Sequence, residues 1–177
     1  MGNDSIAGQA VGAFGERAVE AELLRHGWIP ANINATVKNA AEFDISAWKE
    51  SRQILVRVKA CKPNSRAFQF GGFKPEETIP IPNFIAADFT ILVSMGDTRG
   101  SDQFYVVPTR VVRKEIALRQ RDYLKVSKRD GGTRKDTGHW ALYLDSRRNG
   151  KDEGGYGLAK KWGKYLENWQ SLETGAD

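Results

Sequence analysis

Residues 42–59 read E-F-D-I-S-A-W-K-E-S-R-Q-I-L-V-R-V-K, and this stretch decides the fold. Two strand-like runs flank a polar turn at residues 49–52, which predicts a β-hairpin. Strand side chains alternate between the two faces of a sheet, so Asp44 is expected on the face opposite its two apolar neighbours. By the same rule Arg57 and Lys59 are expected to share a face. A carboxylate and an ammonium group therefore come together at one end of the hairpin.

This pairing of groups favours one kind of chemistry. Carboxylates bind hard divalent cations such as Mg²⁺, and a nearby lysine can position or activate a water molecule. Asp44 and Lys59 together are therefore typical of a metal-dependent phosphodiesterase.

The composition limits the class of protein. The chain has 177 residues, of which 40% are hydrophobic and 28% charged, values that are ordinary for a globular domain with its own core. A single cysteine, Cys61, excludes an internal disulfide and is typical of a reducing compartment. The sequence starts without a secretory signal, and no apolar run approaches the roughly 20 residues that span a bilayer. We expect one domain over residues 1–177, soluble and cytoplasmic, with no membrane partner.

The charge is unevenly distributed along the chain. Residues 110–135 contain ten Lys or Arg against three Asp or Glu, a net +7, which leaves −2 for the remainder of a chain whose net charge is +5. A basic stretch on a nearly neutral body is the electrostatic footprint of a protein that binds a phosphate backbone. A solvated helix and loop is the alternative interpretation.

A helix is expected over residues 5–26, because apolar side chains recur at three- and four-residue spacing. These are Val11, Phe14, Ala18, Ala21 and Leu24. Glu16 lies at the edge of this stripe. Glycines at positions 8, 12 and 15 lack the preceding strand and the G-K-[ST] of a phosphate-binding loop, so we interpret them as small residues for close helix packing.

The remaining elements follow from periodicity and turn residues. Strands are expected at residues 42–48, 54–60, 88–94, 103–107 and 139–144, helices at 110–120 and 158–172, and a loop at 66–84. The strand at 54–60 is apolar almost throughout, which indicates a central position in the sheet. This order predicts an α/β or α+β domain in which helices flank a mixed central β-sheet.

Several of these residues form a pattern that resembles a known superfamily. Gly15-Glu16 on the first helix, F-D-I around Asp44 and V-x-V-K at residues 56–59 look like the PD-(D/E)XK restriction-endonuclease-like superfamily, closest to its Holliday-junction-resolvase and type IV restriction-like branch. The strands at residues 88–93 and 104–107, which lead into a helix, resemble a segment of small stand-alone nuclease-like proteins. The resemblance covers residues 12–116 and implies a restriction-endonuclease-like core.

The resemblance implies roles for particular residues. Asp44 would be the main metal ligand, Glu16 would assist directly or through water, and Lys59 would orient the attacking water or stabilise charge on the phosphate. The cofactor would be Mg²⁺ or Mn²⁺, and the substrate would be DNA. A homodimer is also considered. Basic residues that we expect to contact nucleic acid are Arg57, Lys62, Arg110, Arg113, Lys114, Lys128 and Arg129.

Arg57 departs from the superfamily pattern, which has an acid or an amide at that position. A guanidinium a few ångströms from a divalent cation costs several kcal/mol unless it is screened. Three explanations stay open. Glu16 and Asp44 hold the metal alone; a carboxylate such as Glu42 or Glu50 has moved into the site; or the metal is lost and Arg57 with Lys59 binds phosphate, paired with Asp44.

Three functional hypotheses follow from the sequence. The first is a Mg²⁺-dependent DNA endonuclease, and the second is a catalytically inactive nuclease-fold protein that binds nucleic acid. The third is a protein-interaction scaffold with a regulatory or immunity role, in which the charges of residues 110–135 would be scattered. The isolated His26 and His139 predict no metal pair, and Cys61 has no recognisable histidine partner for nucleophilic chemistry.

Overall fold

The structure is a computed structural model, and it describes residues 3–33, 43–63, 65, 67–71, 87–128, 131–136, 138–144, 147–148, 151–152 and 157–175. Glu42 and Arg129, which the sequence analysis singled out, lie outside the described residues, as does most of the expected loop at 66–84. The expectation of a single domain over 1–177 stays a prediction. Among the described residues, no helix is long and apolar enough to cross a membrane.

A five-stranded mixed sheet forms the centre of the protein, in the order β1-β2-β3-β5-β6. β3 and β5 run parallel, and the other neighbouring pairs are antiparallel. The strands are β1 (Ile29–Asn32), β2 (Ile45–Lys49), β3 (Arg52–Cys61), β5 (Phe89–Ser94) and β6 (Gln103–Pro108). The apolar run at 54–60 therefore lies in the central strand, as predicted. β2 begins three residues later than expected.

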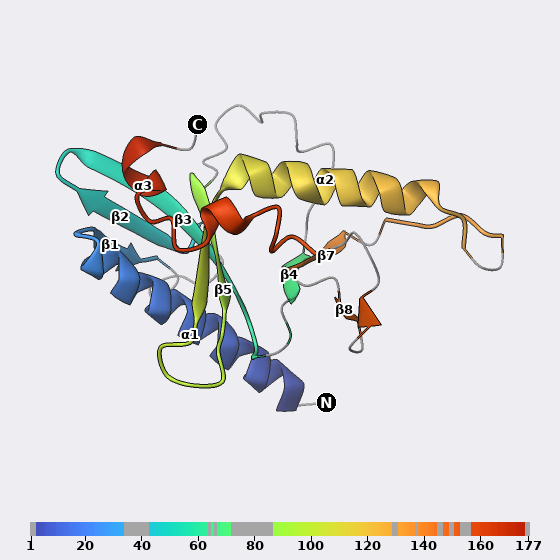
Figure 1. Ribbon diagram of the computed structural model, residues 1–177, viewed down its shortest axis with the longest axis horizontal. Helices are drawn as coiled ribbons and strands as arrows, with labels where there is room; N and C mark the ends of the chain where they lie inside the picture. The colour runs from blue at the N-terminus through green and yellow to red at the C-terminus, as the bar shows by residue number, and fades with distance from the viewer. Residues whose placement is uncertain are drawn as a thin grey trace.

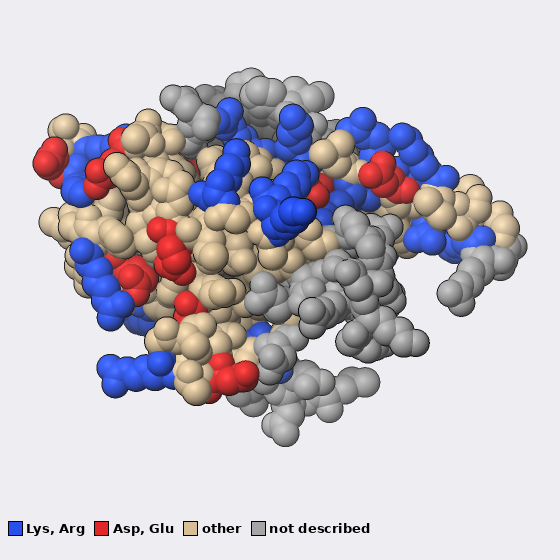
Figure 2. Space-filling model, viewed as in Figure 1, with Lys and Arg blue, Asp and Glu red and all other residues tan. Residues whose placement is uncertain are grey.

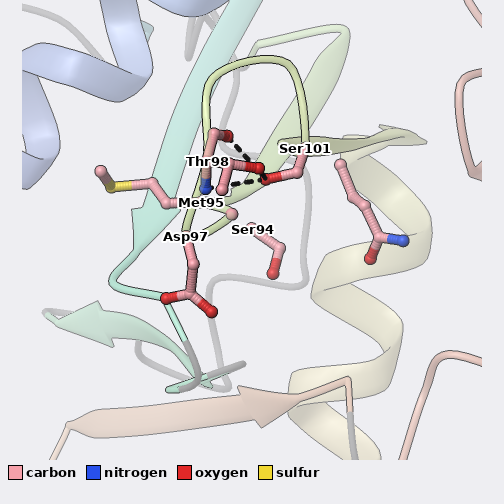
Figure 3. Close-up of a pocket in the computed structure, with 7 residues that line it drawn as sticks. Ser94, Met95, Asp97, Thr98 and Ser101 are labelled. Carbon is pink, nitrogen blue, oxygen red and sulfur yellow. Dashed lines mark hydrogen bonds between the residues drawn. The ribbon is translucent and has the colours of Figure 1, made fainter.

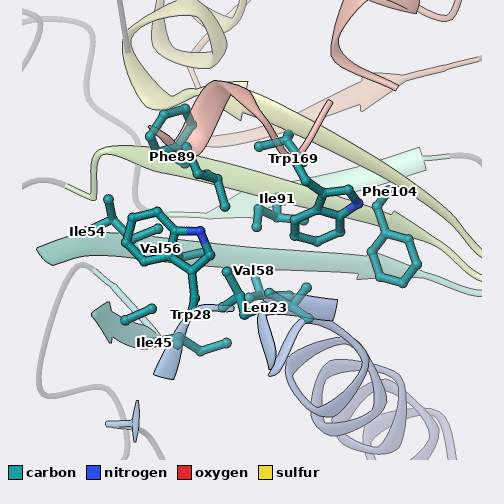
Figure 4. Packing of buried hydrophobic residues seen from close by; sticks show 14 of the residues in the cluster. Leu23, Trp28, Ile45, Ile54, Val56, Val58, Phe89, Ile91, Phe104 and Trp169 are labelled. Carbon is teal, nitrogen blue, oxygen red and sulfur yellow. The ribbon is translucent and has the colours of Figure 1, made fainter. Parts of the chain in front are cut away.

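Helices cover both faces of this sheet. α1 (Asn3–Arg25) and α2 (Thr109–Lys125) lie on opposite sides of it in Figure 1. The period-two alternation of the strands divides the core into two clusters, one on each face. Val56, Ile91 and Val106 belong to the α1 side, and Figure 4 shows how the side chains there pack around Leu23 and Trp28. The expected mixed sheet flanked by helices is confirmed.

The buried face of α1 differs from the predicted stripe. Gly15, Val19 and Leu23 are the buried positions in its described part, whereas Phe14 is 39% exposed and Leu24 60% exposed. The buried positions recur every four residues, within the predicted three- and four-residue spacing, but the stripe is displaced. Gly15, which adds no side chain to a hydrophobic pattern, packs against the central strand. Close packing is confirmed for Gly15, whereas a Cβ added at position 8 or 12 would meet no described atom of another element within 4 Å.

A smaller second sheet lies on the α2 side. β4 (Ala67–Gly71) pairs antiparallel with β7 (His139–Tyr143), and Phe68 and Leu142 are buried in the same cluster as Val112 and Ile116 of α2. The strand β4 falls where a loop was expected. α2 also continues five residues beyond its predicted end. A further short pair is formed by β8 (Arg147–Arg148) and β9 (Lys151–Asp152).

The predicted C-terminal helix at 158–172 is wrong. This segment consists of turns, a short 3-10 helix η2 (Gly163–Tyr165), an isolated bridge to β6 and one helical turn, α3 (Ser171–Thr174). Trp162 is buried in the cluster on the α2 side, but Trp169 is buried in the cluster on the α1 side. One straight helix cannot place both tryptophans on opposite faces of a sheet. The chain therefore passes around the β6 edge, where Glu167 adopts a φ of 51°.

Candidate functional site

Asp44 lies immediately before β2, at an irregularity in the pairing with β3. Its backbone N–H donates to the carbonyl of Val56, which is also the register partner of Ile45. Two residues of one strand therefore oppose one residue of the other, as in a β-bulge. The Asp44 carboxylate accepts a hydrogen bond of 2.6 Å from the backbone N–H of Val58. This bond holds the carboxylate against the backbone of β3, in a direction that regular alternation does not determine.

Glu16 lies next to Gly15, which packs against the same part of β3. Gly15 packs against the strand so closely that a Cβ at this position would lie 2.5 Å from the Cβ of Ala60 and 3.5 Å from Val58. The absence of a side chain at position 15 thus lets α1 approach the central strand. Glu16 is half-buried beside this contact.

Asn32, the last residue of β1, orients two glutamates of α1. Its side-chain amide donates to Glu16 at 2.9 Å and to Glu20 at 2.7 Å. β1 is hydrogen-bonded to β2, with Asn32 opposite Ile45, so this residue links α1 to the start of β2. Sequence reasoning missed this role of Asn32, because the partners are 12 and 16 residues away in the chain.

Lys59 and Arg57 share one face of β3, as predicted. This is the face of Cys61, which is buried in the cluster on the α2 side. The ammonium group of Lys59 lies 5.8 Å from the centre of the Phe70 ring on β4. Both basic residues are half-buried rather than solvated at the surface.

The candidate catalytic residues thus relate to three consecutive residues of β3, residues 58–60. Asp44 bonds to Val58, Lys59 is itself the next residue, and Gly15, the neighbour of Glu16, contacts Ala60. No described strand pairs with β3 on the β2 side beyond Val56, because the β2 pairing stops there. This part of β3 is therefore where a ligand could reach groups from both faces of the sheet.

Glu50 cannot belong to this site. It lies in the turn between β2 and β3, with a φ of 54°, at the opposite end of the hairpin from Asp44. Six residues of extended chain separate them, about 20 Å at 3.3 Å per residue. One of the two carboxylates considered as a replacement ligand is therefore excluded, and the other, Glu42, lies outside the described residues.

The acidic groups that remain are few. Among the described residues, no three His, Cys, Asp or Glu side chains converge on a common metal position. Asp44 and Glu16 are a donor set of the kind that Mg²⁺ uses, since this ion is commonly held by one or two carboxylates and completes its shell with water. The residues present fit that ion, and its binding stays a prediction.

The basic residues of the expected nucleic-acid contact set are distributed over two regions. Lys62 is exposed directly after β3, and Arg110 and Lys114 are exposed on α2, where Arg113 is half-buried. Lys128 is exposed just after α2. Lys62 adjoins the candidate site along the chain, whereas the other residues belong to a separate basic surface.

A polar hollow of about 370 Å³ opens at the turn between β5 and β6 (Figure 3). It is lined by Ser94, Met95, Gly96, Asp97, Thr98, Ser101 and Gln103. The hydroxyl of Ser101 donates to the carbonyl of Thr98 and accepts from its N–H, so part of the polar lining stabilises the turn itself. Ser94 is the register partner of Cys61, which places the hollow beside the carboxyl end of β3.

Comparisons with known proteins find a similar fold but no family for this chain. No family model matches this chain, and no curated protein matches it. The fold is similar to that of a bacterial homing endonuclease, I-Ssp6803I, with a TM-score of 0.51 over 95% of each chain. The sequences are 14% identical, so the likeness concerns the fold alone. The structure of MepB also matches, at 9% identity over 77% of this chain and 93% of that one, with a TM-score of 0.32.

Proposed function

We propose that this protein is a Mg²⁺- or Mn²⁺-dependent DNA endonuclease of the PD-(D/E)XK type. The observation that supports it is the convergence of α1, the bulge before β2 and the central strand on residues 58–60. Glu16, Asp44 and Lys59 belong to these elements, and they are the residues that the superfamily pattern picks out. The likeness to a homing endonuclease fold supports the same conclusion.

Each residue has a role that its surroundings suit. Asp44 and Glu16 would hold the cation, which when bound supplies charge neutralisation at the phosphate and a more acidic water molecule. The hydrogen bonds from Val58 and Asn32 hold the two carboxylates in fixed directions, which preorganises the site. Lys59 follows Val58 on the central strand and would position water or stabilise charge on the phosphate.

A plasmid-nicking assay with Mg²⁺ or Mn²⁺ tests this function, and the fold offers a matched control. Asp88 lies on the β5 side of β3, where its carboxylate accepts a hydrogen bond of 2.7 Å from the N–H of Leu55. Asp44→Asn and Asp88→Asn thus remove the same charge from equivalent hydrogen bonds. Asp44→Asn and Lys59→Ala should reduce nicking at least 100-fold, within the range of losses for groups that act on the transition state, while Asp88→Asn should retain it. Equal cleavage by wild type, Asp44→Asn and Lys59→Ala would show that a contaminant cleaves the plasmid, and it would exclude nuclease activity of this protein.

A second candidate function rests on Arg57. This guanidinium shares the face of Lys59, so the two together suit phosphate binding without hydrolysis. The protein would then be a catalytically inactive nuclease-fold protein that binds nucleic acid. It should bind duplex DNA in a salt-dependent way and show no nicking at any Mg²⁺ or Mn²⁺ concentration.

The third hypothesis, a protein-interaction scaffold, receives less support. It required scattered charges at residues 110–135, whereas the exposed cations of α2 keep to one side of the helix. A homodimer stays a prediction that a sedimentation measurement with and without DNA would test.

A further inference from the structure

The exposed cations of α2 form a stripe. Arg110, Lys114, Arg121 and Lys125 are exposed and follow one another at intervals of four, seven and four residues. At 3.6 residues per turn they lie within about 60° of one another around the helix and extend about 22 Å along it. The buried Val112 and Ile116 occupy the opposite side. The helix thus buries its apolar side in the core and presents a line of positive charge.

The C-terminal segment is fixed beside this helix. Leu158 and Trp162 are buried in the same cluster as the apolar side of α2. The backbone N–H groups of Leu158 and Ala159 donate to the carbonyls of Tyr143 and Leu144, each at 2.9 Å. These contacts fix the backbone that carries the lysines of this segment beside α2.

A buried carboxylate joins the two elements. Glu115 of α2 is 8% exposed, and it accepts hydrogen bonds from Arg119 at 3.0 Å and from Lys161 at 2.6 Å. Lys161 itself keeps a side-chain exposure of 59%. Glu115 therefore neutralises Arg119 inside the protein and at the same time holds an exposed lysine of the C-terminal segment against α2.

We propose that the α2 stripe and Lys160, Lys161 and Lys164 form one surface that binds the phosphate backbone of double-stranded DNA, with Glu115 as the residue that positions the C-terminal part. The three lysines are exposed. Figure 2 shows Lys and Arg side chains gathered on one face of the molecule, over α2 and over the segment next to it. This inference rests on the proposed function for its choice of DNA.

The chemistry of the α2 stripe favours a duplex over a single strand. Single-stranded nucleic acid is bound by aromatic side chains that stack with its bases, between the basic groups. The one aromatic residue of α2, Tyr123, lies on another side of the helix, where it packs edge-on against Trp140 and beneath the guanidinium of Arg134. The stripe therefore offers charge without stacking platforms, which suits contact with a regular phosphate backbone.

Salt-dependent binding of a 20-base-pair duplex tests the surface. Binding is measured in EDTA, so that a failure of the proposed nuclease activity does not affect the result. Each phosphate contact contributes about −0.9 to the slope of log K against log salt. Lys160→Gln with Lys164→Gln should therefore make the slope about 2 units less negative. A matched pair, Arg25→Gln with Arg99→Gln, removes two exposed charges from α1 and from the β5–β6 turn and should leave the slope unchanged.

Glu115→Gln tests the positioning role, because two effects have opposite signs there. The substitution makes the protein one unit more positive, which by charge alone would tighten DNA binding. If Glu115 positions Lys161, the variant instead loses about one contact and binds more weakly. Tighter binding by Glu115→Gln would overturn the positioning role. Equal slopes for the Lys160/Lys164 and Arg25/Arg99 variants would overturn the proposed DNA-binding surface. Tighter binding of a single strand or of phosphatidylserine vesicles than of the duplex would also overturn it.

Discussion

Gly15 of α1 and Ala60 of β3 lie so close together that a Cβ added at position 15 would be 2.5 Å from the Cβ of Ala60. This contact fixes the distance between the first helix and the central strand. The next helix residue, Glu16, and the preceding strand residue, Lys59, are two of the three candidate catalytic residues. The geometry of the candidate site is therefore set by a helix–strand contact that contains no catalytic atom.

Substituting Gly15 should separate packing from helix propensity. In Gly15→Ala the new methyl group collides with a central strand, and we expect a loss of about 1–3 kcal/mol in the free energy of unfolding. Gly12→Ala is the control, since a Cβ added there would meet no described atom of another element within 4 Å and alanine favours a helix by about 1 kcal/mol over glycine. Urea unfolding measures both. Stabilisation by both substitutions would contradict the helix–strand contact.

Asn32→Ala should weaken the site without touching a candidate ligand. Its amide no longer holds the Glu16 carboxylate, and loss of such a supporting hydrogen bond typically costs 10–100-fold in metal affinity or activity. We expect nicking to fall by this factor at limiting Mg²⁺ and to recover partly at high Mg²⁺. Glu20→Gln is the control, because it leaves the bond between Asn32 and Glu16 in place. An equal loss in Glu20→Gln would assign the direct role to Glu20 instead.

Arg57→Gln restores the residue type that the superfamily pattern has at this position. If Asp44 and Glu16 hold a cation, removing a nearby positive charge should lower the Mg²⁺ concentration for half-maximal nicking about tenfold, equivalent to about 1.4 kcal/mol. Arg52→Gln, on the same strand but near the other end of the hairpin, should not change it. If Arg57→Gln binds DNA more weakly than wild type and neither of the two nicks the plasmid, the non-catalytic nucleic-acid-binding function is favoured.

The stability contributed by Glu115 should depend on pH. Burial raises the pKa of this carboxyl, but hydrogen bonds and charge from Lys161 and Arg119 outweigh it and hold the pKa below its ordinary 4.5. A lowered pKa in the folded state stabilises the protein above 4.5, and that contribution is lost as the pH falls through the folded-state value.

Comparison of wild type with Glu115→Gln by urea unfolding measures this dependence. We expect a difference of about 1–3 kcal/mol at pH 7, as for hydrogen bonds to a buried charged group, which shrinks below pH 4.5. Glu22→Gln removes a surface pair with Arg25 and should cost under about 1 kcal/mol. A difference for Glu115→Gln that grows as the pH falls would contradict the assigned contacts.

The sequence alone was sufficient for the central part of the fold. The run at 54–60 is apolar at every position except Arg57 and Lys59, and such a strand is typical of the middle of a sheet, so its central position followed. Alternation placed Arg57 and Lys59 on one face, because a regular strand has a fixed period of two. The motif residues Glu16, Asp44 and Lys59 came from the resemblance to a superfamily pattern, and their catalytic roles stay a prediction.

The tertiary structure decided what depends on distant partners. The helical spacing of 158–172 was overridden because Trp162 and Trp169 are buried on opposite faces of the sheet. The bulge at Asp44 and the bonds of Asn32 to the α1 glutamates join residues that local patterns cannot relate. Sequence periodicity reports which residues avoid water, whereas the direction of a side chain at an irregular position depends on the groups that the completed fold places around it.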